Sequence, residues 1–233
     1  MTDALERLMP PVKYAETNGV RLAYYEVGPS GSGVPVVFCH GFPELAFSWR
    51  HQLKAFGDAG RWAVAPDQRG YGLSDRPEPV TDYDIEHLCN DLIGLIDHLG
   101  AEKAIWCGHD WGGIVVWQMA LRHPARTAGV IGVNTPFMPR PPADPIEIMR
   151  RRMGEQMYIV HFQKPGEADA ILGEDARKTM SMFLKRPVQG MPADSRGFDQ
   201  DVEEGQSAFA LVPMLQMYSA ADDPRESFMS EIG

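Results

Sequence analysis

The sequence predicts an α/β protein built on a mostly parallel sheet, because strand-type and helix-type segments alternate along residues 1–136. Short apolar runs that suit buried strands are separated by longer segments whose apolar residues recur at every third or fourth position. Asn18-Gly19, between two runs of β-type residues, marks an antiparallel hairpin at one edge of this sheet. Residues 1–136 are therefore expected to form a sheet-based core.

The elements of this core are expected in a regular order. The expected strands cover residues 13–17, 21–27, 34–39, 63–65, 103–107 and 130–133. The expected helices cover residues 49–56, 83–99 and 114–122. The second helix has the clearest pattern, with apolar residues from Ile85 to Leu99 at intervals of three and four and Gly100 where many helices end.

The pattern changes after the sixth expected strand, where a run of prolines interrupts the chain. The following segment is rich in methionine, and Ile146, Met149, Met153 and Val160 are expected on one stripe of helix. No later segment has the pattern of a parallel-sheet strand. Residues 137–233 are therefore expected to form a helical elaboration of the sheet.

Composition excludes several kinds of partner. With 44% hydrophobic and 23% charged residues, the chain resembles folded globular proteins. A net charge of −10 favours neither nucleic acid nor anionic lipid, and no apolar run is long enough to cross a bilayer. Three cysteines, two within apolar runs, favour a reducing cytoplasm. No metal or organic cofactor is implied, and the oligomeric state is not indicated.

The most informative segment runs from Cys107 to Gly113, between an expected strand and an expected helix. A sharp strand-to-helix turn needs very small residues two before and two after its apex, and Gly108 and Gly112 meet this need around Asp110. A carboxylate is ionised at neutral pH, so an aspartate at this apex can attack an electrophilic carbon without activation by a base. The alternative interpretation is an ordinary helix N-cap aspartate.

Two further motifs accompany this turn. The HGFPE motif at residues 40–44 follows the expected central strand, where a backbone N–H can form an oxyanion hole together with the N–H of Trp111. A glycine-punctuated loop at residues 67–75, DQRGYGLSD, follows the next strand. In this order, HGFPE, DQRGYGLSD and GHDWGG resemble the α/β-hydrolase superfamily and specifically its epoxide hydrolase branch, over about residues 13–165.

The resemblance implies an α/β-hydrolase core with a helical cap inserted after the sixth strand. It also implies a hydrolase acting on ether bonds, with an epoxide and water as partners. Asp110 would attack an epoxide carbon to form an alkyl ester, and water would then attack the ester carbonyl to release a vicinal diol. The backbone N–H groups of Phe42 and Trp111 would hold the oxyanion, and Tyr158 in the cap would protonate the ring oxygen.

The sequence also suggests roles for the residues that would line the substrate site and for three of the histidines. The expected substrate-binding residues are Phe42, Pro43, Trp111 and His161. His161 shares a helical face with Tyr158, although a surface histidine is the favoured interpretation, and Tyr158 can also be an interfacial packing residue. His40 is expected to fix its loop by hydrogen bonds, and His109 to be a buried spacer.

The resemblance also implies a general-base histidine and a supporting acid that this sequence does not show. All seven histidines lie between His40 and His161, and Asn134 stands where some relatives carry the acid. Tyr218 lacks the family context of a second ring-opening tyrosine. We therefore expect these 233 residues to be the N-terminal part of a protein of roughly 300 residues, without the C-terminal strands and with an incomplete cap.

Two other functions remain open from the sequence. A haloalkane dehalogenase would use the same aspartate, with Trp111 donating to the halide, but Phe42 offers no polar side chain to help it. A non-catalytic protein that binds a small apolar ligand is favoured by the missing histidine. The presence of Asp110, the HGFPE motif and Tyr158 argues against that second alternative.

Overall fold

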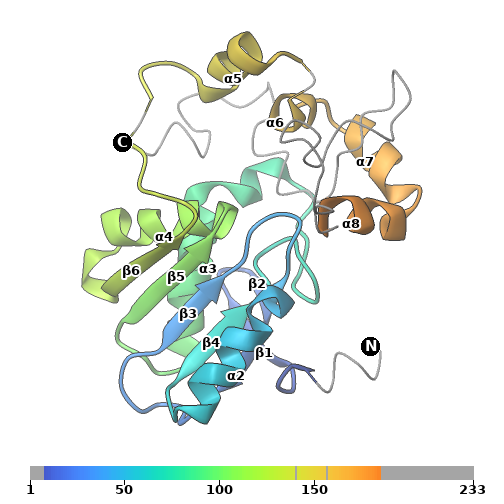
Figure 1. Cartoon of the computed structure of the whole chain (residues 1–233). Helices are drawn as coiled ribbons and strands as arrows, with labels where there is room; N and C mark the ends of the chain where they lie inside the picture. The colour runs from blue at the N-terminus through green and yellow to red at the C-terminus, as the bar shows by residue number, and fades with distance from the viewer. Residues whose placement is uncertain (1–7, 140, 156, 185–233) are drawn as a thin grey trace, which may run out of the picture. The chain divides into compact units, whose positions relative to one another are not determined.

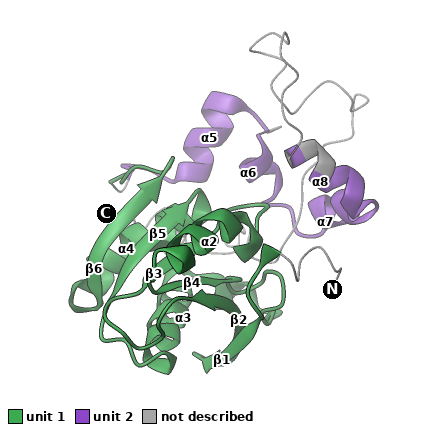
Figure 2. Cartoon of the chain, turned by 60° about the horizontal axis from the view of Figure 1, so that its bottom comes forward, with its two compact units in different colours: residues 1–139, 232–233 green, residues 140–231 purple. Residues whose placement is uncertain are grey.

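A computed structural model describes residues 8–139, 141–155 and 157–184 of the chain. These residues fall into two compact units that divide after residue 139 (Figure 2). The first unit contains the sheet and the helices packed on it, and the described part of the second unit is helical (Figure 1).

The described strands form one six-stranded sheet in the order β1-β2-β4-β3-β5-β6 (Figure 1). The strands are β1 (Lys13–Thr17), β2 (Val20–Val27), β3 (Val36–Cys39), β4 (Ala63–Pro66), β5 (Ala104–His109) and β6 (Thr127–Val133). β2 pairs antiparallel with both β1 and β4, whereas β4, β3, β5 and β6 are parallel to one another. The predicted sheet, with an antiparallel edge and a parallel core, is confirmed.

The edge hairpin turns at the predicted dipeptide. Asn18 and Gly19 have φ angles of 46° and 76°, and Thr17 pairs with Val20 across the turn. Positive φ at both central residues gives the two-residue turn whose twist matches that of the flanking strands, and Asn-Gly is its preferred sequence.

Helices cover both faces of the sheet, with α2 in front of it and α3 and α4 behind it in Figure 1. The helical segments of this unit are η1 (Ala46–Trp49), α2 (Arg50–Asp58), η2 (Val80–Tyr83), α3 (Ile85–His98), α4 (Trp111–Arg122) and η3 (Pro124–Arg126). α3 begins two residues later than expected because the Asp84 side chain accepts the N–H of His87, at 2.8 Å, and caps the helix there. Gly100, at φ 72°, follows its end as predicted.

The core between α2 and the sheet is aromatic. The ring of Phe38 on β3 lies 4.9 Å from that of Trp49 and 5.3 Å from that of Phe56, between ring centroids. Leu53 of α2 and Cys107 of β5 are buried in the same cluster. Burying each large apolar side chain of this kind contributes about 1.5–3 kcal/mol, so this layer anchors the strand that leads into the HGFPE motif.

All three cysteines are buried, as expected for thiols that act as small core side chains. Burial raises the pKa of Cys107 to about 11 and raises that of Cys39 still further. Both thiols are therefore protonated at neutral pH.

A buried ion pair joins three separate segments of the first unit. Arg69, after β4, donates from Nε and Nη2 to both carboxylate oxygens of Asp91 on α3, at 2.8 and 2.6 Å. Asn18 in the hairpin turn donates to the same carboxylate at 2.8 Å and accepts from Arg69 through its carbonyl at 3.1 Å. Burial raises the pKa of the Asp91 carboxyl, and the hydrogen bonds from Arg69 and Asn18 act against that shift.

The second unit differs from its expected pattern. Its described helices are α5 (Pro145–Met153), α6 (Tyr158–His161), α7 (Glu167–Gly173) and α8 (Ala176–Leu184). The expected single stripe from Ile146 to Val160 is wrong, because α5 ends at Gly154, with φ 81°, and Val160 belongs to another helix. Ile146 is buried, whereas Met153 is 62% exposed. Within residues 141–155 and 157–184 the structure has no strand, in agreement with the sequence.

Among the residues that the structure describes, no helix combines the length and the apolar character needed to span a bilayer.

We expect Asp91→Ala to lower the free energy of unfolding by about 3–5 kcal/mol, because it leaves the buried Arg69 guanidinium without its carboxylate. The matched control is Asp58→Ala, which breaks the exposed Lys54–Asp58 pair on α2 and should cost only about 0–1 kcal/mol. Urea titration followed by tryptophan fluorescence measures both values. Equal losses would show that the buried pair has no special role.

Candidate active site

Asp110 lies at the sharp turn between β5 and α4, as the sequence predicts. Its backbone has φ 53° and ψ −122°, in a region that residues with a Cβ atom rarely occupy. A conformation of this kind costs about 1–3 kcal/mol and persists only where the surrounding structure enforces it.

Close packing around the turn explains its glycines. A Cβ atom on Gly108 would lie 2.2 Å from the carbonyl oxygen of Gly112, and one on Gly112 would lie 2.3 Å from that of Cys39. On Gly41, a Cβ atom would lie 2.4 Å from the Cβ atom of Asp110. Each of these contacts is shorter than real Cβ atoms allow. Gly108 thus permits the tight turn itself, and Gly41 and Gly112 permit the close approach of the turn to the HGFPE loop and the end of β3.

The carboxylate of Asp110 is directed to the HGFPE loop and not to its own helix. Phe42 donates its backbone N–H to Oδ1 of Asp110 at 3.0 Å, and the Asp110 side chain makes no capping hydrogen bond to α4. The interpretation of Asp110 as an ordinary N-cap residue is therefore wrong. The side chain is half-buried, which leaves it partly accessible to a ligand.

Glu44 anchors the HGFPE loop. Its Oε2 atom accepts the N–H of Gly41 at 3.0 Å and lies 3.1 Å from Nδ1 of His109. The prediction that His109 is a buried spacer is wrong, since 32% of its side chain is exposed and it bonds to Glu44. β5 ends at His109, so its side chain lies at the rim of the sheet, within reach of the neighbouring loop.

His40 fixes the same loop from beneath, as expected. It is fully buried, with Nδ1 2.9 Å from the carbonyl oxygen of Gly41 and Nε2 3.1 Å from the backbone N–H of Gln68. Burial lowers the pKa of His40, against the opposing effects of the Gly41 carbonyl and the carboxylates of Asp67 and Glu44. The imidazole is therefore held in its neutral form.

Asp67 organises the glycine-punctuated loop after β4. Its two carboxylate oxygens accept the backbone N–H groups of Ala46, at 2.9 Å, and Leu73, at 3.1 Å. Gly72 is needed beside it, because a Cβ atom there would lie 2.1 Å from the Asp67 carboxylate. The sequence reasoning recognised the glycines of this motif but not the positioning role of its first residue.

Thr135, just beyond β6, packs against the turn from the other side. Its Oγ1 donates to the carbonyl oxygen of Asp110 at 3.3 Å, and its own carbonyl accepts from Nε1 of Trp117 at 2.9 Å. A Cβ atom on Gly113 would lie 2.5 Å from that of Thr135. The sequence reasoning missed this contact, and the GG pair after the turn is the only sequence signal for it.

The expected site residues divide between the two units. Asp110, Phe42, Pro43 and Trp111 lie together in the first unit, with Phe42 and Pro43 half-buried and Trp111 buried. Tyr158 and His161 belong to α6 of the second unit, where both are half-buried, and the Tyr158 ring meets that of Phe162 edge-on at 5.5 Å. Their catalytic roles stay predictions. Tyr218 lies outside the described residues.

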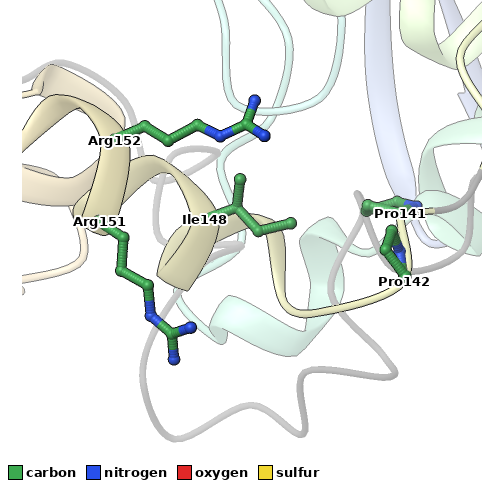
Figure 3. A pocket seen from close by; sticks show the side chains of 5 residues that line it. All are labelled: Pro141, Pro142, Ile148, Arg151 and Arg152. Atoms are coloured by element: carbon green, nitrogen blue, oxygen red, sulfur yellow. The ribbon is translucent and has the colours of Figure 1, made fainter.

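The second unit has a surface cavity of about 480 Å³ beside α5. Its lining residues are Pro141, Pro142, Ile148, Arg151 and Arg152. Ile148 extends from the helix toward the two prolines, and the arginine side chains project on either side of it (Figure 3). No expected site residue lines this cavity, and no group of His, Cys, Asp and Glu side chains in the described ranges could hold a metal ion.

The sequence motifs and the turn geometry agree with one known family. Residues 34–204 match the family model described as alpha/beta hydrolase fold. The chain belongs to this family. The α/β-hydrolase assignment accounts for the parallel sheet and for the turn that presents Asp110.

Individual relatives of this α/β-hydrolase chain are named epoxide hydrolases. This chain is 50% identical to Epoxide hydrolase A of Mycobacterium tuberculosis over 176 residues. The matched segment is 75% of this chain and 54% of that protein. A crystal structure of Epoxide Hydrolase A from Mycobacterium thermoresistibile superposes with a TM-score of 0.71 at 52% identity, over 75% of this chain and 56% of that one. The chain therefore spans about half the length of these relatives.

The match to a more distant relative includes a larger share of both chains. The AB hydrolase superfamily protein YfhM of Bacillus subtilis is 35% identical over 208 residues, which is 89% of this chain and 72% of that protein. The likeness to α/β hydrolases thus extends beyond the segment that carries the three motifs.

We expect Gly108→Ala to destabilise the protein by about 1–3 kcal/mol, because the new methyl group would overlap a backbone carbonyl that cannot move aside. The matched control is Gly129→Ala on the neighbouring strand β6, where the nearest atoms to an added Cβ lie 4.0 Å away. That substitution should be neutral or stabilise by up to about 1 kcal/mol. Thermal unfolding measures both, and equal stability of the two variants would contradict the packing described for the turn.

Proposed function

We propose that this chain carries the nucleophile and the oxyanion hole of an epoxide hydrolase. The proposal depends above all on the Asp110 carboxylate, which is held on a strained turn and oriented by the N–H of Phe42. The epoxide hydrolase names of relatives at about half identity support it.

In the first step, a carboxylate oxygen of Asp110 forms a bond to one epoxide carbon while the ring C–O bond breaks. The hydrogen bond from Phe42 occupies Oδ1 and thereby orients the carboxylate for attack. The ring oxygen must gain a proton as it leaves, and we assign that proton to the phenol of Tyr158, whose O–H is a hydrogen-bond donor. The product of this step is a hydroxyalkyl ester on Asp110.

In the second step, water attacks the ester carbonyl, and the tetrahedral oxyanion collapses to release the diol and restore the carboxylate. We assign the backbone N–H groups of Phe42 and Trp111 as donors to that oxyanion. A base must take the proton of the attacking water. The printed sequence has no histidine after His161, so we expect the 233-residue chain to form the ester faster than it hydrolyses it.

Residues 137–233 would act as the cap of this hydrolase, with Tyr158 and His161 facing the substrate. The short described helices of this region and the exposed Arg151 and Arg152 on α5 are compatible with a helical cap that has one solvated face. The three buried cysteines, none of them in a disulfide, support a reducing cytoplasm as its location.

We expect incubation with an excess of a small epoxide, such as styrene oxide, to add the mass of one epoxide to the chain, and peptide mass spectrometry to locate it on Asp110. Asp110→Ala should abolish the adduct, because the nucleophilic carboxylate is gone. Asp58→Ala, which removes an exposed carboxylate of α2, is the matched control and should leave it unchanged.

Other outcomes of this experiment identify other functions. An adduct formed only from a haloalkane, with release of halide, would indicate a dehalogenase. Saturable binding of epoxides with unmodified Asp110 would indicate a non-catalytic binding protein.

We expect Tyr158→Phe to slow formation of the adduct by about 100-fold, since general acid catalysis by a positioned side chain contributes about 10²–10⁴-fold. Tyr14→Phe, on the exposed edge strand β1, is the matched control. The time course of adduct mass at a fixed epoxide concentration gives the rates. An unchanged rate for Tyr158→Phe would support the packing interpretation of this residue.

A further inference from the structure

The peptide group that joins Gly41 to Phe42 is hydrogen-bonded at both ends. Its N–H donates to Oδ1 of Asp110 at 3.0 Å, and its carbonyl oxygen accepts the N–H of Glu44 at 3.1 Å and lies 2.9 Å from Nδ1 of His40. A peptide group is planar, so the direction of its carbonyl determines the direction of its N–H. The groups that hold the Gly41 carbonyl therefore also set the direction of the Phe42 N–H. His40 is the side chain among them, and the backbone N–H of Glu44 is the other.

The surroundings of His40 determine which ring nitrogen carries the proton. The backbone N–H of Gln68 can only donate, so Nε2 of His40, 3.1 Å away, must accept. A neutral imidazole has one acceptor nitrogen and one N–H, so Nδ1 is the donor to the Gly41 carbonyl. The Gln68 side chain also donates to the His40 carbonyl at 2.6 Å, and the Tyr71 ring packs edge-on against the imidazole at 4.7 Å.

We propose that His40 is a positioning residue for the reaction at Asp110: by donating from Nδ1 to the Gly41 carbonyl, it aims the Phe42 N–H at the carboxylate and later at the oxyanion. The role in the reaction rests on the proposed function. Because hydrogen bonds in series polarise one another, the same contact makes the Phe42 N–H a better donor. Gln68, in the DQRGYGLSD loop, determines the His40 tautomer by donating its backbone N–H to Nε2. The orientation of the Phe42 N–H therefore depends on that loop as well.

Two substitutions separate the two hydrogen bonds of His40. His40→Asn places an amide nitrogen at the position of Nδ1 and so keeps the donor to Gly41 while losing the acceptor for Gln68. His40→Gln reaches the position of Nε2 and so keeps an acceptor for Gln68 while losing the donor to Gly41. A purely structural role for this buried side chain would make the two variants alike.

Amide hydrogen exchange of Phe42, followed by NMR in the ¹⁵N-labelled chain, reads out the proposed contact without any substrate. We expect exchange in His40→Gln to be at least about tenfold faster than in the unsubstituted chain, and exchange in His40→Asn to stay within about twofold. The amide of Trp106, on the central strand β5, reports that the fold is intact. Equal acceleration in both variants, or in neither, would overturn the proposal.

A measurement on the unsubstituted chain covers the case in which the variants do not fold. The ¹⁵N shifts of the two ring nitrogens of His40 distinguish the tautomers directly. We expect the form protonated at Nδ1, and the form protonated at Nε2 would overturn the proposal, because it cannot donate to Gly41.

The chemical consequence is tested separately with the epoxide adduct. We expect His40→Gln to form the adduct at least about tenfold more slowly than His40→Asn, because the Phe42 N–H would no longer orient the attacking Asp110 carboxylate, and a misplaced reacting group costs up to about 10²-fold in rate. Equal rates with altered Phe42 exchange would overturn the role in the reaction. If the unsubstituted chain forms no adduct, the proposed function fails, whereas the exchange and tautomer measurements still decide whether His40 aims the Phe42 N–H.

Discussion

The candidate site depends on one steric constraint, the close approach of the HGFPE loop to the turn at Asp110. Gly41 and Gly112 have no room for a Cβ atom, and Gly108 faces the backbone of the helix that follows it. This proximity lets the N–H of Phe42 reach the carboxylate, and the same packing enforces the strained backbone of Asp110. A larger side chain at any of these glycines would separate the two segments and remove the oriented carboxylate.

The topology explains why residues far apart in sequence meet here. β3, β4, β5 and β6 are parallel to one another, so the loops that follow them gather at one edge of the sheet, where ligands of open α/β sheets bind. The loop after β3 supplies the N–H of Phe42, the loop after β4 holds His40 through Gln68, and Thr135 after β6 supports the turn. These loops thus contribute hydrogen bonds around Asp110, which lies in the turn after β5.

Sequence reasoning succeeded where a local pattern has a local cause. Asn18-Gly19 predicted its hairpin because that dipeptide suits positive φ, and the spacing of Gly108 and Gly112 predicted the turn because sterics allow little else. It failed for His109, whose partner is 65 residues away in the chain, and for the stripe that Gly154 interrupts.

The polar contacts of Asp67 and Thr135 were missed for the same reason as that of His109. Neither residue has a hydrogen-bonding pattern that the neighbouring sequence reveals, because the partners are set by which loops the sheet brings together. The opposite holds for Asp110, whose competing interpretation as an N-cap was settled only by the direction of its carboxylate.

The carboxylates at this edge of the sheet accept hydrogen bonds from uncharged backbone N–H groups, and this choice of donor affects what the carboxylates can do chemically. The carboxylates of Asp110, Glu44 and Asp67 each accept a backbone N–H, whereas Asp91, on the side of the sheet covered by α3, is paired with an arginine. A guanidinium would neutralise a carboxylate and occupy both of its oxygens, as Arg69 does for Asp91. The Phe42 N–H, in contrast, orients the Asp110 carboxylate without placing a positive charge beside it, which suits the attack on carbon that we propose. A neutral His40 preserves that condition, because a protonated imidazole beneath the loop would add a positive charge and lose the acceptor that Gln68 requires.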